Sequence, residues 1–437
     1  MANGALSCRT GRTGRASNSR WAPSFWRNAP GQTSFPSPLL RKSQSSSAHG
    51  IVLRYGGHFQ NVAYSMASRS RSPAGYRSMS WKRNDPLLSR ECWHWNRRRM
   101  RFFEHKWPAL LLWPLSFLFS IVVAIRNKLY AVGFFKSFAV DAFVISVGNI
   151  TVGGTGKTPT VHYLADKFLS LHKRVAIISR GYGRHSRGTV VVSDGRNILR
   201  PVQECGDEPF LLARLCRRAI VVVDANRVRA AALTMEKFAP DIIILDDAFQ
   251  HRRMKRDFDL LTFRQNRPLG NGFCLPAGPL REPKKNLLRA HAILVNGLGQ
   301  ERPEELLNVR IPILFAQYVV KDIVNQKGDS LLSAVRGSRT FAFCGLAQPD
   351  NFMHTLRELG VNILGFMAFN DHHRYGQDDV QKVKMKVQEL RADVVLTTEK
   401  DWVKLPLDFL DEQWFRLQIE MKPTDEKKLM SLFEIRE

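Results

Sequence analysis

Acidic residues are absent from the first 84 positions of this 437-residue chain. Residues 1–100 contain 17 lysines and arginines against two acids, Asp85 and Glu91, and so carry more than half of the chain's net charge of +27. The segment is rich in serine and has no apolar run near Met1, which excludes a secretory signal peptide. An arginine-rich, serine-rich and acid-poor start indicates an organelle transit peptide; a disordered basic tail is the alternative.

The uneven charge also bears on partners and location. Because the positive excess is concentrated before residue 100, it does not indicate a nucleic-acid surface, and no basic motif interleaved with aromatic residues follows it. We therefore expect no nucleic-acid partner. The abundance of arginine favours import into the mitochondrion, with association to the inner membrane, and a plastid is the alternative.

Paired cysteines are also missing. The six cysteines are scattered without C-x-x-C spacing, at positions 8, 92, 205, 216, 274 and 344. This excludes a disulfide framework and a zinc site and fits a reducing compartment. Hydrophobic residues at 44% and charged residues at 24% are ordinary values for a globular protein, so wholesale disorder is excluded as well.

Long apolar runs are few, and one stands out. Residues 107–125 read WPALLLWPLSFLFSIVVAI without a charge, between a basic cluster at 97–101 and Arg126. As a helix, these residues would extend about 28 Å, close to the thickness of a bilayer's hydrocarbon core. We expect a membrane-anchor helix within 100–130, either spanning the bilayer or dipping into one leaflet; a buried core helix is the alternative.

After residue 142 the pattern becomes α/β. Short continuous apolar runs of the kind that form parallel strands covered on both faces occur at 143–147, 175–179, 219–223, 242–245 and 292–295, the last of which should close a first sheet. Three later runs, at 340–343, 361–366 and 394–397, indicate a second, smaller unit. The predicted fold class is α/β, with a P-loop NTPase-type parallel-sheet domain at 131–320, a smaller C-terminal α/β domain at 321–437, and the membrane helix before them, preceded by the transit and disordered segment 1–99.

The strongest chemical signal lies between the first strand and a helical pattern that starts near Pro159. Residues 148–158 read GNITVGGTGKT, a glycine-rich loop in the setting that a phosphate-binding loop requires. Glycines let successive backbone N–H groups face one anion, and the helix N-terminus adds partial positive charge. We assign residues 151–158 to ATP, with Lys157 on the phosphates and the Thr158 hydroxyl on Mg²⁺. The candidate nucleotide-binding residues are Thr151, Val152, Gly153, Gly154, Thr155, Gly156, Lys157 and Thr158.

A second signal is the run 241–247, DIIILDD, in which a buried strand ends in paired carboxylates. Adjacent acids repel each other unless a cation or a proton offsets the repulsion. In P-loop enzymes an acid at this place holds Mg²⁺ directly or through water. Asp246 and Asp247 are therefore candidate metal ligands.

Two basic runs, 179–184 (SRGYGR) and 251–256 (HRRMKR), directly follow strands. Loops at the carboxyl ends of parallel strands line the binding crevice of an open sheet, where arginine binds phosphate groups through two hydrogen bonds. A solvated basic face is the alternative for each arginine.

Taken together, these stretches resemble one family, the tetraacyldisaccharide 4'-kinases, which are the lipid A 4'-kinases of Gram-negative bacteria. The resemblance covers roughly residues 100–437 and suggests an organelle-targeted, plant-like member. Its motifs, in order, are SVGNITVGGTGKTP (146–159), SRGYGR (179–184), GDEP (206–209), DANR (224–227), LDDAFQHRR (245–253), LPAGPLREP (275–283), FNDHH (369–373) and TTEKD (397–401).

The resemblance implies transfer of the γ-phosphate of ATP to the 4'-hydroxyl of an acylated disaccharide 1-phosphate at a membrane surface, a late step of lipid A biosynthesis. It assigns Asp207 and His372 as a catalytic pair beside Lys157. Glu208 joins the candidate metal ligands. Arg180 and Arg281 become candidates to bind the lipid substrate. The apolar segment resembles the family's membrane anchor.

One position departs from the family's DDGFQH pattern, because Ala248 replaces its glycine. If that position needs a positive φ, the alanine is strained by about 1 kcal/mol or more. A membrane-associated nucleotide switch is the alternative function, although residues 246–249 are not D-x-x-G and residues 398–401 do not match [NT]-K-x-D.

Overall fold

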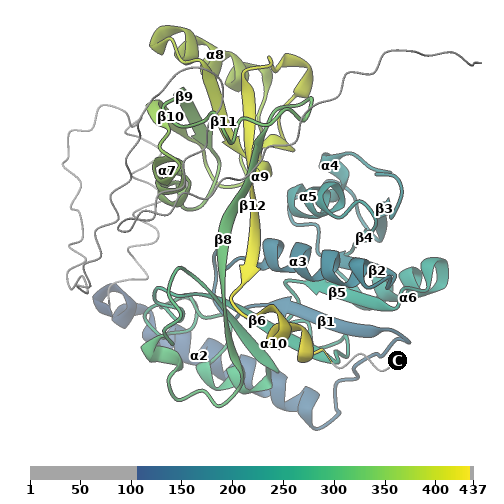
Figure 1. Ribbon diagram of the computed structural model, residues 1–437. Coiled ribbons are helices and arrows are strands. Elements are labelled where there is room, and N and C mark those ends of the chain that lie inside the picture. Colours follow the sequence, from purple (N-terminus) through teal and green to yellow (C-terminus); the bar gives the residue numbers. More distant parts are fainter. Residues whose placement is uncertain (1–105, 434–437) are drawn as a thin grey trace, which may run out of the picture. The chain divides into compact units, whose positions relative to one another are not determined.

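A computed structural model describes residues 106–433 (Figure 1). The predicted transit segment lies outside the described residues. One sheet of twelve strands runs through the described chain, in the order β10-β9-β11-β12-β8-β7-β6-β1-β5-β2-β4-β3. Its strands are β1 (Phe143–Gly148), β2 (Val175–Ser179), β3 (Val190–Asp194), β4 (Ile220–Val223), β5 (Ile242–Asp246), β6 (Phe258–Arg264), β7 (Ala292–Asn296), β8 (Ile313–Val324), β9 (Arg339–Cys344), β10 (Asn362–Ala368), β11 (Val394–Thr398) and β12 (Trp414–Pro423).

Helices connect these strands. They are α2 (Lys106–Ala131), α3 (Lys157–Ser170), α4 (Val202–Cys205), α5 (Asp207–Leu215), α6 (Arg227–Phe238), α7 (Pro349–Glu358), α8 (Gln377–Leu390), α9 (Glu399–Trp402) and α10 (Glu426–Ser431), with 3-10 turns at Lys284–Arg289, Glu304–Leu306 and Leu407–Phe409. Strand pairs are parallel except for β3–β4 and β8–β12. The α/β class and the parallel sheet are thereby confirmed.

The expectation that residues 292–295 close a first sheet is wrong. β7 pairs in parallel with β8, and β8 pairs antiparallel with β12, which carries the same sheet into the C-terminal half. The proposed boundary at residue 320 falls inside β8. β8 was not recognised because Gln317, Lys321 and Asp322 interrupt its apolar residues, so the strand as a whole is not one continuous apolar run. The strands β3, β6 and β12 were not predicted either.

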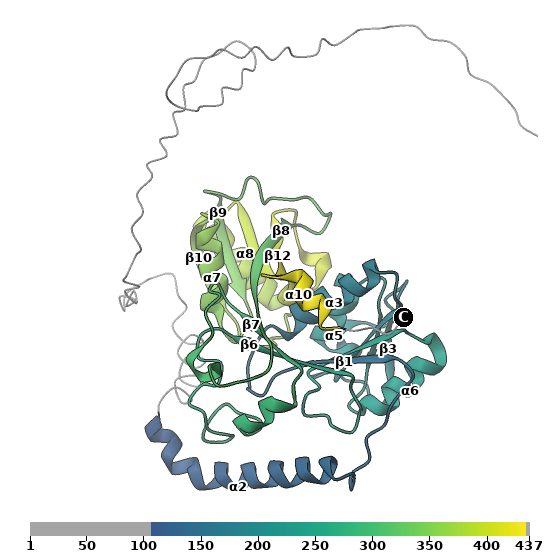
Figure 2. The same cartoon turned by 60° about the horizontal axis from the view of Figure 1, so that its bottom comes forward.

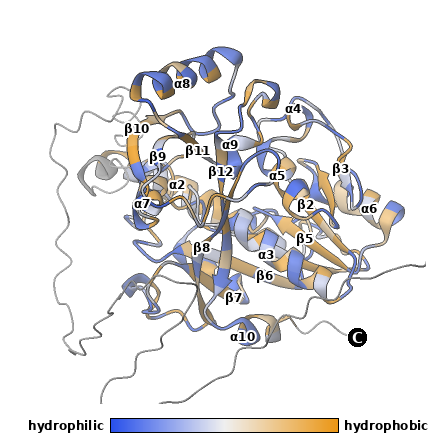
Figure 3. Cartoon of the chain, turned by 45° about the horizontal axis from the view of Figure 1, so that its top comes forward, coloured by the Kyte–Doolittle hydropathy of each residue, from blue (hydrophilic) through white to orange (hydrophobic). Residues whose placement is uncertain are grey.

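Successive residues of the central strands point to opposite faces of the sheet and pack into two different hydrophobic clusters. On β1, Ile145 and Val147 pack with α3, α5 and the C-terminal α10, whereas Val144 packs with α6 on the other face. The central strands are accordingly hydrophobic along their length, while helices such as α8 alternate between polar and apolar residues (Figure 3). Because both faces of the sheet are covered, a binding site is expected in the loops at the carboxyl ends of the strands.

Helix α2 lies along the rest of the described protein rather than inside it (Figure 2). One face carries polar contacts: Ser116 Oγ donates to the Cys274 carbonyl, and Asn127 Nδ2 donates to Glu282 at 3.0 Å. The opposite face exposes large apolar side chains, among them Leu118, 59% exposed. By length and composition, the stretch Leu111–Ala131 could cross a membrane, and 17% of it is buried. The alternative of a buried core helix does not hold, because no described residue covers this face.

Candidate active site

The glycine-rich loop leaves β1 and enters α3 at Lys157, as its sequence predicts. Gly156 is the residue before the helix, with φ 89°, and a Cβ there would meet the hydroxyl of Tyr318, so glycine is required. The backbone N–H groups of residues 153–156 donate to no acceptor in the described chain. Together with the N-terminus of α3, these free donors form a cradle for an anion.

Neighbouring side chains hold the loop in this shape. Thr155 Oγ1 accepts a hydrogen bond from Asn149 at 3.0 Å and lies 2.9 Å from the Thr262 hydroxyl. Asn296, at the end of β7, donates to the Thr155 carbonyl at 2.9 Å. Thr155 therefore has a structural part within the predicted nucleotide-binding segment. Sequence reasoning assigned no part to Asn149, Thr262 or Asn296, because their roles depend on strand neighbours that are distant in sequence.

The paired acids end β5, next to the loop. Asp246 is buried, and Ser179 donates to one of its carboxylate oxygens at 2.9 Å; the other oxygen is buried without a partner. Burial raises the pKa of Asp246 to about 7, and the negative charges of Glu208 and Asp247 add to the shift. A carboxylate in this state favours either a proton or a nearby cation.

Asp247 has the opposite electrostatics. Burial alone would raise the pKa of Asp247, but the positive charges of Lys157 and Arg281 outweigh it and lower the pKa below its usual value. The Asp247 carboxylate lies 3.7 Å from Lys157 Nζ, and Arg281 Nη1 is 3.0 Å from both of its oxygens. The Arg281 guanidinium thus contacts a predicted metal ligand.

These residues fit a divalent cation bound through few protein ligands. The unpartnered oxygen of Asp246 and the carboxylate of Asp247 are hard oxygen donors beside the phosphate cradle. Within the described residues no cluster of three acidic, histidine or cysteine side chains could hold a metal alone. Mg²⁺ matches this arrangement because it usually takes most of its ligands from water and phosphate oxygens.

The second half of the protein adds a histidine. His372, from the loop after β10, places Nδ1 3.2 Å from an Asp207 carboxylate oxygen at the start of α5, although 165 positions separate them. Burial alone would raise the pKa of Asp207, but the hydrogen bond to His372 and the charge of Lys404 lower it. His372 has φ 59°, a conformation that costs free energy in most residues and is concentrated at functional sites. The predicted Asp207–His372 pair is brought together.

Lys400, at the start of α9, lies between the Asp207–His372 pair and Glu208, which acts on Asp246. Its ammonium group lies 3.4 Å from His372 Nε2, 3.3 Å from Asp371 and 3.9 Å from Glu208. Glu208 in turn contributes to the raised pKa of Asp246. Lys400 belongs to the TTEKD motif, but the sequence alone assigned it no role.

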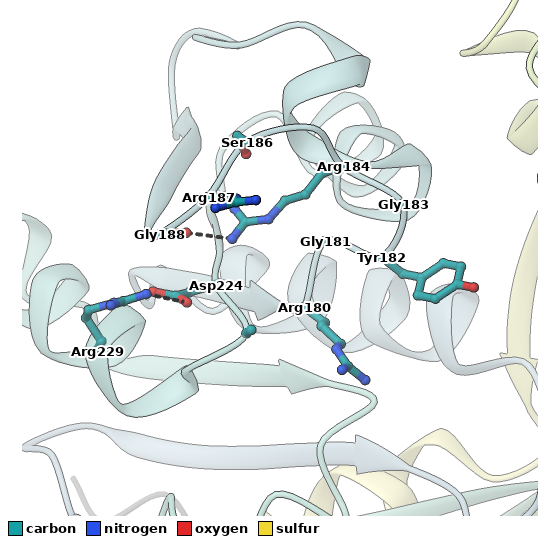
Figure 4. Close-up of a pocket in the computed structure, with 11 residues that line it drawn as sticks. Arg180, Gly181, Tyr182, Gly183, Arg184, Ser186, Arg187, Gly188, Asp224 and Arg229 are labelled. Atoms are coloured by element: carbon teal, nitrogen blue, oxygen red, sulfur yellow. Dashed lines mark hydrogen bonds and ion pairs between the residues drawn. The ribbon is translucent and has the colours of Figure 1, made fainter.

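A pocket of about 390 Å³ is lined by several arginines (Figure 4). The SRGYGR loop forms one wall, and Asp224 forms part of the other, with its charge matched by Arg229 at 2.7 Å. Tyr182 also lines the pocket, and its ring centre lies 5.7 Å from that of His372. Arg180 lines the pocket without a hydrogen bond or ion pair to any described residue. The lining therefore carries an excess of positive charge next to the candidate base.

The substitution in the DDGFQH pattern causes no backbone strain. Ala248 is buried and does not have a positive φ; the positive φ of 47° falls on the preceding residue, Asp247. The conditional expectation of strain at Ala248 is therefore not met, because aspartate, which tolerates the left-handed region better than most residues, occupies that conformation.

The fold and the site define a P-loop nucleotide-binding protein in which a carboxylate of the first half, Asp207, meets a histidine of the second half, His372. The family model described as tetraacyldisaccharide-1-P 4'-kinase matches residues 108–436. The tetraacyldisaccharide 4'-kinase of Geobacter sulfurreducens is 41% identical over 301 residues, covering 68% of this chain and 84% of that protein. The enzyme of the same name from Desulfotalea psychrophila is 37% identical, covering 67% and 87%.

A solved structure agrees with these relatives. The crystal structure of LpxK from Aquifex aeolicus, titled an "apo" form in complex with ATP, has a TM-score of 0.61 and 34% identity, covering 75% of this chain and 99% of that one. The chain belongs to the tetraacyldisaccharide-1-P 4'-kinase family.

Proposed function

We propose that this protein transfers the γ-phosphate of ATP to the 4'-hydroxyl of a tetraacyldisaccharide 1-phosphate, a precursor of lipid A. Family membership supports this phosphotransferase activity. The observation that supports it within the structure is the Asp207–His372 contact, because Asp207 can accept a proton and is followed in sequence by Glu208, whose charge acts on Asp246. A nucleotide switch needs no such base.

The chain's own residues account for each requirement of the reaction. The N–H groups of the loop and Lys157 hold the phosphates, and Asp207 accepts the proton of the attacking hydroxyl. Asp207 is ionised near neutral pH, and its lowered pKa makes it a weak base. A weak base is sufficient when the phosphoryl group departs through a loose transition state, in which little proton transfer precedes its arrival. His372 orients the carboxylate.

Mg²⁺ is part of this proposal. Asp246, Asp247 and the Thr158 hydroxyl would hold it, with Glu208 nearby, and the cation would neutralise the charge that develops on the phosphate oxygens. Arg281 keeps Asp247 ionised and in place through its two contacts of 3.0 Å. It remains a candidate to bind the lipid substrate as well.

The acceptor is a lipid, and two surfaces suit it. The arginine-lined pocket offers Arg180 to the acceptor's own phosphate, one side chain away from His372 through Tyr182. The exposed apolar face of α2 suits a membrane interface, at which acyl chains need not leave the bilayer, a transfer that costs about 0.8 kcal/mol per CH₂. The polar contacts of α2 with Cys274 and Glu282 favour a helix that lies in one leaflet over one that spans.

The test is a double-mutant cycle in a membrane-based assay with ATP and a 4'-dephospho lipid A precursor. Removing a general base typically lowers kcat by about 10²–10⁴-fold, so Asp207→Ala should do so while ATP affinity stays within a few-fold. His372→Ala should be strongly non-additive with Asp207→Ala, because the two residues act as one unit. Independent losses that multiply would assign them separate roles. Wild-type protein that binds ATP but phosphorylates no lipid acceptor would refute the kinase proposal.

We also propose that the protein is imported into an organelle, the mitochondrion in preference to the plastid. The composition of residues 1–100 supports this, and the family match begins only at residue 108. A fluorescent reporter fused to residues 1–90 should enter mitochondria, whereas a fusion with the arginines of that segment changed to glutamine should stay in the cytosol. A wild-type fusion that stays cytosolic refutes import, and plastid import corrects the organelle.

A further inference from the structure

Arg264 lies at the carboxyl end of β6, directly beside the glycine-rich loop. β6 pairs with β1, the strand from which the loop departs, through Gly148 and Leu261. One guanidinium nitrogen, Nη2, lies 3.4 Å from the place that a Cβ on Gly154 would occupy. The Arg264 side chain therefore packs against the middle of the phosphate cradle.

This arginine has no partner. Within the described part of the chain, Arg264 forms no hydrogen bond and no ion pair, whereas Arg281 binds Asp247 and Arg184 binds two backbone carbonyls. Burial lowers the pKa of Arg264, and no carboxylate of the described chain is among the groups that act on it. Placing an unmatched cation in a half-buried position costs free energy unless an anion binds there.

The position of Arg264 indicates which part of an anion it meets. In the sheet, β1 lies between β6 and β5. The groups that act on the transferred phosphate, namely Lys157 with Asp247 and the Asp207 pair, gather on the β5 side. Arg264 approaches the loop from the opposite, β6 side. A nucleotide whose γ-phosphate points toward the acids would present its remaining phosphates toward Arg264.

We infer that Arg264 is a nucleotide-positioning residue that donates hydrogen bonds to a phosphate of ATP that stays on the nucleotide, the α- or β-phosphate. The inference rests on the proposed ATP site. It adds to that site a phosphate-binding residue that lies outside the glycine-rich segment. Because such a contact is present with ATP and with ADP alike, Arg264 supplies binding and not a specific stabilisation of the transition state.

The experiment measures the affinities of ATP and ADP for the full-length protein in detergent by isothermal titration calorimetry. Arg264→Met keeps the apolar stem and removes the charge, and it should weaken both nucleotides equally, by about 10- to 100-fold, the value of charge-assisted hydrogen bonds. kcat at saturating ATP should stay within a few-fold. Arg267→Met, which changes an exposed arginine three positions further on, is the matched control and should change neither affinity.

Two outcomes would overturn the inference. Unchanged ADP affinity in Arg264→Met would show that the guanidinium does not contact the retained phosphates, and a loss confined to ATP would place it on the γ-phosphate. Thermal unfolding of the nucleotide-free variant identifies a folding defect. If Arg264→Met does not fold, Arg264→Lys keeps the charge without the paired donors and should lose part of both affinities. The binding assay contains no lipid, so it succeeds or fails independently of the acceptor.

Discussion

The two halves of the sheet use the same geometry for different purposes. In the first half, the loop after β1 is glycine-rich and forms the phosphate cradle, and the carboxyl end of β5 supplies the paired acids. In the second half, the residues after β10 and β11 are not glycine-rich, and they contribute His372 and Lys400. By the roles proposed for these residues, one half binds the nucleotide and the other completes the chemistry.

The largest effect should come from the first half. Lys157→Met removes the ammonium group that reaches the phosphates and balances Asp247, so it should lower kcat/KM for ATP by about 10³-fold and raise KM. Steady-state kinetics with varied ATP would measure both changes. An effect on kcat alone would mean that Lys157 contributes nothing to binding, and the division between the halves would then fail.

Membrane association should also belong to the first half, through α2. The double substitution Phe117→Gln and Leu118→Gln changes two exposed side chains, 55% and 59% exposed, and should reduce vesicle binding by about 100-fold, since burying each is worth about 1.5 kcal/mol or more. Met385→Gln on α8, 59% exposed in the second half, is the matched control and should bind vesicles normally. Equal effects would place the membrane surface elsewhere.

A smaller effect should follow from Lys400→Met in the second half. Lys400 contacts His372 and lies within ion-pair distance of Asp371 and Glu208, but no phosphate-loop residue. We expect kcat to fall by about 10-fold, the size of one charge-assisted bond, with ATP affinity unchanged. A rise in the dissociation constant of ATP would instead show that the second half shares in nucleotide binding.

The smallest effect concerns stability. The pKa of Asp246 is about 7 in the folded protein against 3.8 as its ordinary value, so the folded state holds its proton more tightly. That contribution to stability is complete below about pH 4 and is lost as the pH rises through 7. Asp246→Asn should therefore remove part of the fall in Tm between pH 5 and 8 for the protein without nucleotide, raising Tm at pH 8 by a few degrees. Parallel Tm profiles for both proteins would refute the shift.

The sequence predicted the first half better than the second, for a physical reason. A phosphate loop depends on local glycines and a helix start, and buried parallel strands are continuous apolar runs, so both can be recognised from neighbouring residues. β8 was missed because polar residues interrupt its apolar ones. β12 alternates between polar and apolar residues, a strand pattern that a search for continuous apolar runs does not detect. The unity of the sheet could not be predicted, since it depends on their pairing.

Within the site, the motif residues were easier to predict than the side chains that form hydrogen bonds with them. Asp207 and His372 were paired through a family resemblance, whereas the supports Asn296 and Thr262 become visible only when β6 and β7 lie beside β1. The contact of Arg281 with Asp247 was not foreseen either, because it joins loops 34 positions apart. The roles assigned to these site residues stay predictions.

Glu282 has a geometric consequence for the substrates. Asn127 and Arg126 of α2 bind the Glu282 carboxylate, and the preceding residue, Arg281, binds Asp247. Side chains, and not a linker, therefore fix the spacing between the apolar face of α2 and the phosphate cradle. When the apolar face of α2 lies in a leaflet, the phosphate cradle is held at a fixed distance above the acyl chains. Acceptors would then be selected by how far the hydroxyl stands above the bilayer, and the length of their acyl chains would matter little.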